Sequence, residues 1–525
     1  MEKIYQSILD GHPEIAKIVQ EYGRLRLEEY AGSFFKYVAD SIQPREDLIE
    51  TVSMYARRLL GYKTAGLLER HFADTPVALT ANHHGVDYKF ITVQGTIIFS
   101  LPKILAASAE VIPIVPVLAC GIVPLSNYSF PRGIILSRKI EVPVSPDKKA
   151  RTFLKVPLLP LKYSHSLVSV TGPITGQMVS KAVSYLEKLS QDGELSESER
   201  ICLSALLSDY ARNEILSLPD YSEQAVVLST GVWKKMFAPS IQDNIPELAY
   251  LEMERVVTAL LEKDIRDEGS LTHNLLFDPE LRNGVLKSLD RQFGCWNLEQ
   301  LEMLSKCGTG NHLASEDFRG CGTVFFWSVD DEGRRVPLLI RENGSGPTLT
   351  GIAPGKNISI PLTPDDLWGK LQERRLLPAL FTSFTTLAFA RGIKCVGGFF
   401  QVDYLPLMQQ GLARVLESRG LSDWAQKIAS VPTTNFVAGM NIALSHYPDG
   451  TTEPAGAVEI IAAGGLNQKH LEKIKRLTVN EAVISGLTEI RIKAAGWGKK
   501  TDKPLNSIIR RLVEKIEKKM PRLKL

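Results

Sequence analysis

Residues 76–125, PVALTANHHGVDYKFITVQGTIIFSLPKILAASAEVIPIVPVLACGIVPL, decide the fold of this chain. The stretch opens with a short, apolar, β-prone run, passes through a polar turn and continues into an apolar segment of helical length. It ends in a second apolar run that is rich in proline and β-branched residues, which favour a buried strand over a helix. Strand, turn, helix and strand in this order form a βαβ unit, so we expect a parallel sheet.

Hydrophobic patterns divide the rest of the chain into five regions around this unit. Residues 1–73 carry apolar side chains at helical spacing and are predicted to be a helical N-terminal region. We expect residues 74–180 to form the first half of an α/β core, 181–300 a helical insertion or cap, 301–465 the second half of the core with a hairpin, and 466–525 a C-terminal helical region. The predicted fold is therefore α/β, with a parallel or mixed sheet core, a helical N-terminal region and a helical insertion.

Local signals predict several individual elements. Residues 165–174, HSLVSVTGPI, have the apolar, β-branched pattern of another buried strand. Ser196 and Glu199 have the spacing of a capping box at a helix start. A turn at Gly333 separates two β-rich runs and predicts a hairpin.

Composition narrows the class of protein. The formal net charge of +3 over 525 residues gives no argument for binding nucleic acid or a membrane surface. The cysteines are scattered and none forms a CxxC pair, which is typical of reduced thiols in a cytosolic protein. Lys103 and Glu110 interrupt the most apolar stretch, so an integral membrane span is not expected. We expect a cytoplasmic protein that acts on a small-molecule substrate; the sequence leaves its oligomeric state open.

The polar turn after the first strand concentrates side chains that move protons or bind ligands. It contains Asn82, His83, His84, Asp87 and Tyr88. In parallel α/β sheets, ligands bind outside the carboxyl ends of the strands. One histidine could act as a general base that Asp87 orients, or His83, His84 and Asp87 could hold a divalent metal. The turn could also bind a phosphate or carboxylate at the helix start, or these side chains could only cap the helix.

Two further segments are predicted to follow buried strands and to supply substrate-binding groups. The loop CGIVPLSNYSFPRG contains Ser126, Asn127 and Arg132, and a guanidinium can hold a carboxylate or phosphate through paired hydrogen bonds. The segment GGFFQVDY, residues 397–404, is predicted to complete a third apolar strand that carries Gln401 and Asp403 at its end. If the sheet is parallel, these groups and the histidine turn lie at the same edge.

The histidine turn resembles acyltransferase motifs. His83 and Asp87 have the H-x-x-x-D spacing of the plant-type BAHD acyltransferases. In that family the histidine deprotonates an acceptor hydroxyl or amine and the aspartate is usually structural, which the resemblance implies here. Residues 494–500, AAGWGKK, are similar to that family's second motif, DFGWG, with alanine in place of aspartate. The turn is also similar to the NHxxxxD box of glycerolipid acyltransferases, one residue shorter.

The order of elements carries another resemblance. A turn after the first strand, a helix, a proline-rich strand and a helical insertion resemble the nucleotidyltransferase-type synthases, which include the bacillithiol-forming cysteine ligase. The signature residues of that group are absent from this chain.

Three hypotheses follow. The first is a transferase that moves an acyl-type group onto a small polar acceptor with a histidine general base. The second is a metal-dependent hydrolase or lyase in which His83, His84 and Asp87 bind the metal, with Asp403 as a further ligand. The third is a non-enzymatic protein that binds a small ligand at the turn.

Overall fold

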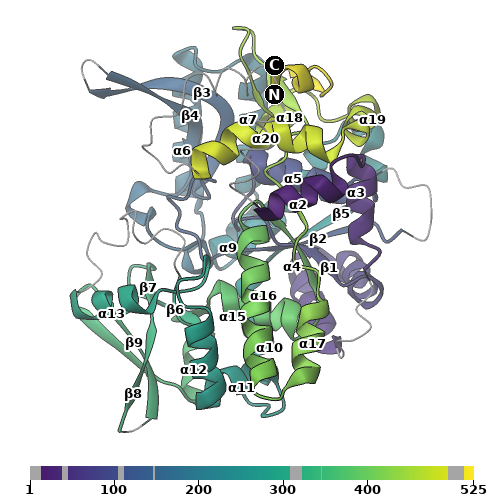
Figure 1. The fold of residues 1–525 in the computed structure, drawn as a ribbon. Helices are drawn as coiled ribbons and strands as arrows, with labels where there is room; N and C mark the ends of the chain where they lie inside the picture. Colours follow the sequence, from purple (N-terminus) through teal and green to yellow (C-terminus); the bar gives the residue numbers. More distant parts are fainter. Residues whose placement is uncertain are drawn as a thin grey trace.

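A computed structural model describes residues 13–37, 45–104, 111–145, 148–307, 322–344, 346–494 and 513–525. Its centre is a five-stranded sheet in which every pairing is parallel. The strands are β1 (Val77–Leu79), β2 (Ile114–Ala119), β5 (Glu247–Glu252), β12 (Lys394–Gly398) and β13 (Phe436–Ala438). The predicted α/β class is confirmed, and the central sheet is parallel rather than mixed (Figure 1).

The order of strands across the sheet is β13-β12-β1-β2-β5. The chain starts at the middle strand β1, moves outward through β2 to β5, then returns to the other side of β1 with β12 and β13. This is the 3-2-1-4-5 order of a doubly wound sheet, and it changes direction between β1 and β12. Polar side chains that leave these two strands therefore enter the crevice where such sheets bind ligands.

Helices cover both faces of the sheet and bury alternate strand residues in two cores. Leu79 and Val117 pack in one core with helices that include α3, α5 and α9, whereas Ala78 and Leu118 pack in the other with α4, α10 and α16. The helices are α2 (Pro13–Tyr22), α3 (Leu27–Phe34), α4 (Glu46–Asp74), α5 (Phe90–Ser100), α6 (Gly176–Gln191), α7 (Glu197–Tyr210), α8 (Asn213–Leu216), α9 (Tyr221–Lys235), α10 (Met253–Asp264), α11 (Leu271–Phe277), α12 (Pro279–Ser288), α13 (Leu298–Cys307), α14 (Pro364–Gln372), α15 (Leu380–Phe384), α16 (Gln401–Ser418), α17 (Ser422–Ser430), α18 (Ala457–Ala462), α19 (Gln468–Arg476) and α20 (Val479–Ala494), with shorter turns η1 (Leu161–Tyr163), η2 (Val168–Val170), η3 (Pro239–Asn244) and the π-helical turn η6 (Thr385–Phe389).

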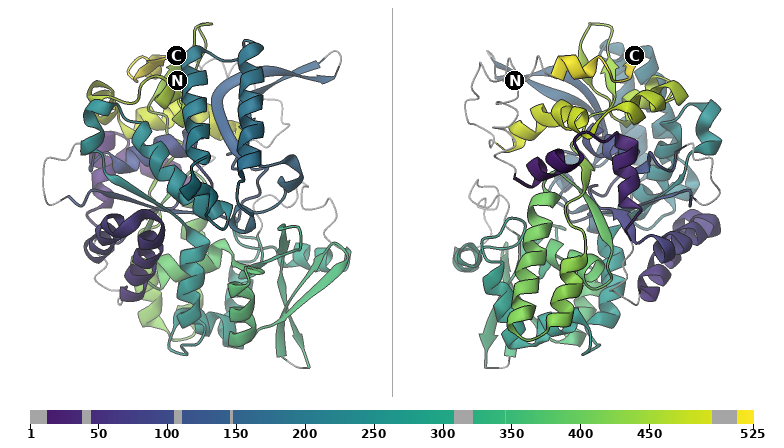
Figure 2. Two further views of the ribbon diagram at one scale, coloured as in Figure 1. Left: turned by 180° about the vertical axis from the view of Figure 1, so that it is seen from behind. Right: turned by 45° about the vertical axis from the view of Figure 1, so that its right-hand side comes forward.

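Smaller sheets surround this central unit. The strand pairs β3–β4 and β8–β9 project from the body as two long arms in Figure 1 and in the left view of Figure 2. The outer strands are β3 (Gly133–Ser145), β4 (Lys148–Pro157), β6 (Phe326–Val329), β7 (Arg335–Pro337), β8 (Leu339–Asn343), β9 (Gly346–Ala353), β10 (Lys356–Pro361), β11 (Leu376–Pro378), β14 (Leu444–His446), β15 (Thr452–Pro454) and β16 (Arg522–Lys524).

Two local predictions are confirmed. The hairpin forms between β6 and β7, and Gly333 turns the chain with a φ of 75°, a value that glycine adopts at little cost. Ser196 caps α7: its hydroxyl accepts a hydrogen bond from the Glu199 amide at 3.2 Å, and the Glu199 carboxylate accepts one from the Ser196 amide at 2.7 Å.

Three local predictions differ from the structure. Residues 165–174 do not form a strand; they contain the short 3₁₀ turn η2, where Gly172 and Pro173 follow the apolar run. The segment 247–252, predicted to belong to a helix, is the edge strand β5 of the central sheet. The run 397–404 is not one strand, because the chain leaves β12 and begins α16 at Gln401.

Some predictions fall on parts of the chain that the structure does not describe. Residues 495–500 of the AAGWGKK motif and most of the predicted C-terminal helix lie outside the described residues. In the described part of the chain, no helix has the length and apolar character needed to cross a membrane.

Candidate functional site

Asp87 ties the turn after β1 to the start of α5. Its Oδ2 accepts a hydrogen bond from Asn82 Nδ2 at 2.8 Å, and its Oδ1 accepts from Thr92 Oγ1 at 2.7 Å and from the Lys89 amide at 3.2 Å. Burial raises the pKa of Asp87 to about 6, against the effect of these donors. The carboxyl group therefore fixes the path of the turn.

His83 is held by Asn127 from the loop that follows β2. Its Nδ1 lies 3.1 Å from Asn127 Oδ1, and that Oδ1 also accepts a hydrogen bond from the Ser129 amide at 3.0 Å. Because an amide N–H can only donate, the Asn127 atom is the oxygen, and His83 Nδ1 must be the donor. In a neutral ring, Nε2 then carries the lone pair. Asn127 orients His83, whereas the hydrogen bonds of Asp87 go to Asn82, Lys89 and Thr92.

His84 faces the opposite way from His83. Successive side chains of an extended segment point to opposite sides, and His83 forms a parallel β-bridge with Cys120. His84 is fully buried, stacks on Tyr250 at 5.8 Å between ring centroids, and donates from Nε2 to the Ser222 carbonyl at 3.1 Å. Burial lowers the pKa of His84 to about 4, so it is neutral and holds the packing under the turn.

The structure does not bring His83, His84 and Asp87 together as a set of metal ligands. The described residues contain no group of three histidine, cysteine, aspartate or glutamate side chains placed to hold a metal ion. His83 and His84 point to opposite sides of one segment, and Asp87 bonds within the turn. Sequence proximity placed these three residues together, but the alternation of side chains separates them.

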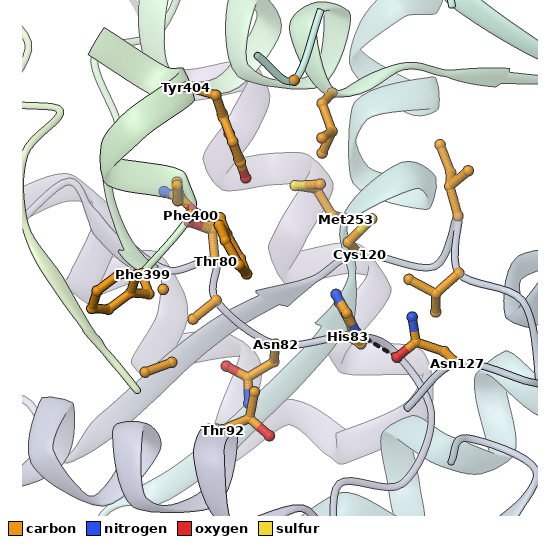
Figure 3. A pocket seen from close by; sticks show the side chains of 18 of the residues that line it. Thr80, Asn82, His83, Thr92, Cys120, Asn127, Met253, Phe399, Phe400 and Tyr404 are labelled. Carbon is orange, nitrogen blue, oxygen red and sulfur yellow. Dashed lines mark hydrogen bonds between the residues drawn. The ribbon is translucent and has the colours of Figure 1, made fainter. Parts of the chain in front are cut away.

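A pocket of about 550 Å³ lies at the carboxyl ends of β1, β2, β12 and β13. Its volume is in the range of small-molecule sites. The predicted residues that line it are Asn82, His83, Asn127 and Gln401, as expected for groups that leave parallel strands at one edge. Figure 3 shows His83 pointing into this pocket, with the ring edge opposite Asn127 facing the cavity.

The other predicted site residues lie outside this pocket. Tyr88 is buried with its hydroxyl 3.3 Å from that of Tyr210, and Arg132 donates to the Leu159 carbonyl at 3.2 Å. The remaining ones are His84 and Asp87, described above, Ser126 at an exposed loop position and Asp403 in the first turn of α16.

Tyr404 and Arg335 are among the pocket residues that the sequence did not predict. Tyr404 follows Gln401 by one helical turn on α16, and Figure 3 shows its hydroxyl pointing into the cavity from the side opposite His83. Burial raises the pKa of Tyr404 far above its usual value, so the hydroxyl remains a proton donor. Arg335 begins β7 and lies over the Trp327 ring, 4.8 Å from its centroid. Tyr404 could have been predicted from the sequence, because it follows Gln401 at helical spacing. No comparable sequence signal pointed to Arg335.

Cys120 also lines the pocket, beside the buried carboxyl group of Glu254. Burial, and then the charge of Glu254, raise the pKa of the Cys120 thiol well above its usual value. Burial and the charge of Glu252 raise the pKa of Glu254 to about 7. Glu252 itself stays ionised despite its burial, because Arg374 and Arg255 hold its pKa at about 2. The thiol therefore rests in its protonated form.

No protein-family model matches the chain, no curated protein matches its sequence, and no solved structure matches its fold.

Proposed function

We propose that this protein is an enzyme that transfers an acyl-type group onto a small polar acceptor, with His83 as the general base. The observation that carries the proposal is the His83 imidazole, which Asn127 holds in one tautomer with the other ring nitrogen toward the pocket. An oriented base at the carboxyl ends of parallel strands is the arrangement that proton transfer to a bound substrate requires.

The step uses the residues in the following roles. A hydroxyl or amine of the acceptor gives its proton to His83 Nε2 as its oxygen or nitrogen forms a bond to the acyl carbon of the donor substrate. The tetrahedral intermediate then collapses, the bond to the leaving group breaks, and the imidazolium returns the proton to that leaving group. A positioned base contributes about 10²- to 10⁴-fold to such a step.

Tyr404 is placed to stabilise the charge that this step creates. It comes from α16, whereas His83 comes from the turn after β1, and both side chains point into the cavity from opposite sides (Figure 3). A substrate between them would have its nucleophilic group at His83 and its acyl oxygen near the Tyr404 hydroxyl. Because that hydroxyl remains protonated, it can donate to the developing oxyanion.

Cys120 and Cys295 are cysteines that line the pocket, and the surroundings of Cys120 disfavour a nucleophilic role. A nucleophilic cysteine needs a lowered pKa, whereas burial and the Glu254 carboxyl group raise that of Cys120. We therefore assign the attack to a group of the bound acceptor.

The test uses p-nitrophenyl acetate and an acetyl thioester of N-acetylcysteamine as acyl donors, with release of nitrophenolate or thiol as the readout. We expect His83→Gln to lower kcat/KM roughly 100-fold or more. His446→Gln is the matched control, because His446 lies in β14 and bonds to Thr452 outside the pocket. Wild-type protein with neither activity, or a His83→Gln variant as active as wild type, would contradict the proposal. Ligand binding without any turnover would instead favour a binding protein.

A further inference from the structure

The pocket holds one unbalanced charge. Among the described residues that line it, Arg335 is the only lysine, arginine, aspartate or glutamate. The rest of the lining is aromatic, aliphatic or neutral polar, with Phe90, Phe381, Phe384 and Phe400 among the aromatic side chains. Arg335 is exposed, and a ligand that fills this space meets its positive charge beside a wall whose other described residues carry no aspartate or glutamate.

Arg335 differs from the arginines around it in lacking an ion pair with a carboxylate of the described residues. Arg334 pairs with Asp330 at 2.8 Å, Arg375 pairs with Asp331 at 3.1 Å, and Arg374 pairs with Glu252. No carboxylate of the described residues forms an ion pair with Arg335, which contacts the Trp327 ring instead. A guanidinium presents paired N–H donors that match the oxygens of a carboxylate or phosphate. The contact with the indole uses none of these N–H donors in an ion pair with a described carboxylate, so they can bind an anionic ligand.

A second pocket group requires a donor from the ligand. Asn82 is 1% exposed and uses its Nδ2 to donate to Asp87 and Thr96, whereas its Oδ1 accepts no hydrogen bond from the described residues. A buried carbonyl oxygen without a donor costs free energy, and a hydroxyl or amine of a ligand removes that cost. Asn82 and His83 both line the pocket at the turn after β1, so one ligand can reach both residues.

We propose that the substrate of this pocket is an amphiphilic anion: a carboxylate or phosphate monoester on a flat apolar body that also carries a hydroxyl or amine. Arg335 binds the anionic group, the aromatic walls hold the body, and Asn82 accepts a hydrogen bond from the hydroxyl or amine. This substrate class rests on the proposed function only in treating that hydroxyl or amine as the acyl acceptor. Arg335 then selects the substrate by its charge.

The test is a binding measurement by calorimetry with two pairs of probes. The first pair is 4-hydroxycinnamate and its methyl ester, and the second is phenyl phosphate and phenol. We expect wild-type protein to bind at least one anion roughly 10- to 100-fold more tightly than its neutral counterpart. Arg335→Gln should remove that preference and leave binding of the neutral compound unchanged. The first pair reports a carboxylate and the second a phosphate.

Arg334→Gln is the matched control, since Arg334 is the preceding residue and pairs with Asp330. It should bind the probes like wild type. An Arg335→Gln variant that unfolds at the wild-type temperature but keeps the preference would overturn the inference, as would wild-type protein that prefers neither anion. If Arg335→Gln loses its structure, Arg335→Lys replaces it: a positive charge without the paired donors should keep only part of the preference, and full retention of the preference with both probe pairs would exclude paired recognition by the guanidinium.

The outcomes separate this inference from the proposed function. His83→Gln should keep the preference for the anion, because the base is not its binding partner. A charge preference that depends on Arg335, together with undiminished turnover by His83→Gln, would support the substrate class and contradict acyl transfer by His83. If His83→Gln loses turnover but Arg335→Gln keeps the wild-type selectivity, acyl transfer by His83 is supported and the substrate class is contradicted.

Discussion

Replacing Asn127 with alanine tests the geometry on which the site depends. The Asn127 Oδ1 accepts three hydrogen bonds: from His83 Nδ1 at 3.1 Å, from the Ser129 amide at 3.0 Å and from the Ser129 hydroxyl at 2.9 Å. At about 0.5–1.5 kcal/mol net for each bond, the loss of all three lowers the free energy of unfolding by about 1.5–4.5 kcal/mol, with the lower end expected because the bonds are part-buried. The larger effect is on catalysis, because the His83 ring loses the acceptor that selects its tautomer.

We expect Asn127→Ala to lower kcat roughly 10- to 100-fold, since a base displaced by about 1 Å loses activity on that scale. The assay is turnover of the acyl donors named above, with chemical unfolding measured on the same preparations. Ser129→Ala is the control: it removes one of the three bonds and leaves the contact of Asn127 with His83. It should lower stability slightly and leave kcat within about twofold of wild type, since most single surface changes are mild.

A third variant distinguishes orientation from charge. Asn127→Asp keeps an oxygen acceptor for His83 Nδ1 but adds a negative charge, which stabilises the imidazolium. The pKa of His83 should then rise, so the acid limb of the pH–rate profile should move to higher pH while the plateau rate is largely kept. If Asn127→Ala loses stability but keeps its wild-type kcat, Asn127 only shapes the loop and the assignment of His83 as an oriented base is refuted.

Two further predictions follow from the groups around the pocket. Tyr404→Phe removes the hydroxyl opposite His83 and should lower kcat about 100-fold with little change in KM; an unchanged kcat would exclude it as the oxyanion donor. Glu254 has a folded pKa of about 7 against an ordinary value of 4.5, so its protonation favours the folded state as the pH falls from 7 to 4.5. The unfolding free energy of wild-type protein should rise over that interval by up to about 3 kcal/mol from this group. Glu254→Gln should remove that share, and an identical pH dependence in the variant would contradict the assignment.

Strong local signals made the centre of the sheet predictable. β1 and β2 are compact apolar runs that end at polar turns, and their exits carry Asn82, His83 and Asn127 to one pocket. The edge strand β5 was missed because it ends at Glu252 and α10 begins at the next residue, with no turn between them. The helical pattern of α10 therefore predicted a helix for this segment as well. The segment forms a strand instead because it pairs with β2.

The charge of the pocket could not be predicted because tertiary structure alone supplies it. Arg335 stands more than 200 positions from the histidine turn, beside Arg334, and the two have the same residue type in the same hairpin. One pairs with Asp330, whereas the other contacts Trp327 at the pocket. Strand alternation separates their directions, but only the docking of the hairpin against the central sheet decides which direction leads to a ligand.

The same alternation explains why two adjacent histidines have different roles. An extended segment that leaves a buried strand has one side toward the crevice and one toward the interior, so a pair of neighbouring imidazoles cannot both face a ligand. His83 forms a hydrogen bond with the polar loop that follows β2, whereas His84 forms one with Ser222. The Ser222 hydroxyl in turn donates to the ionised carboxylate of Glu252. A shift of this segment by one residue would turn His84 toward the pocket. It would also bury His83 beside the Ser222 hydroxyl and the Glu252 carboxylate, where it could not contact a ligand. The register of the turn against Cys120 therefore determines which of the two imidazoles can take a proton from a substrate.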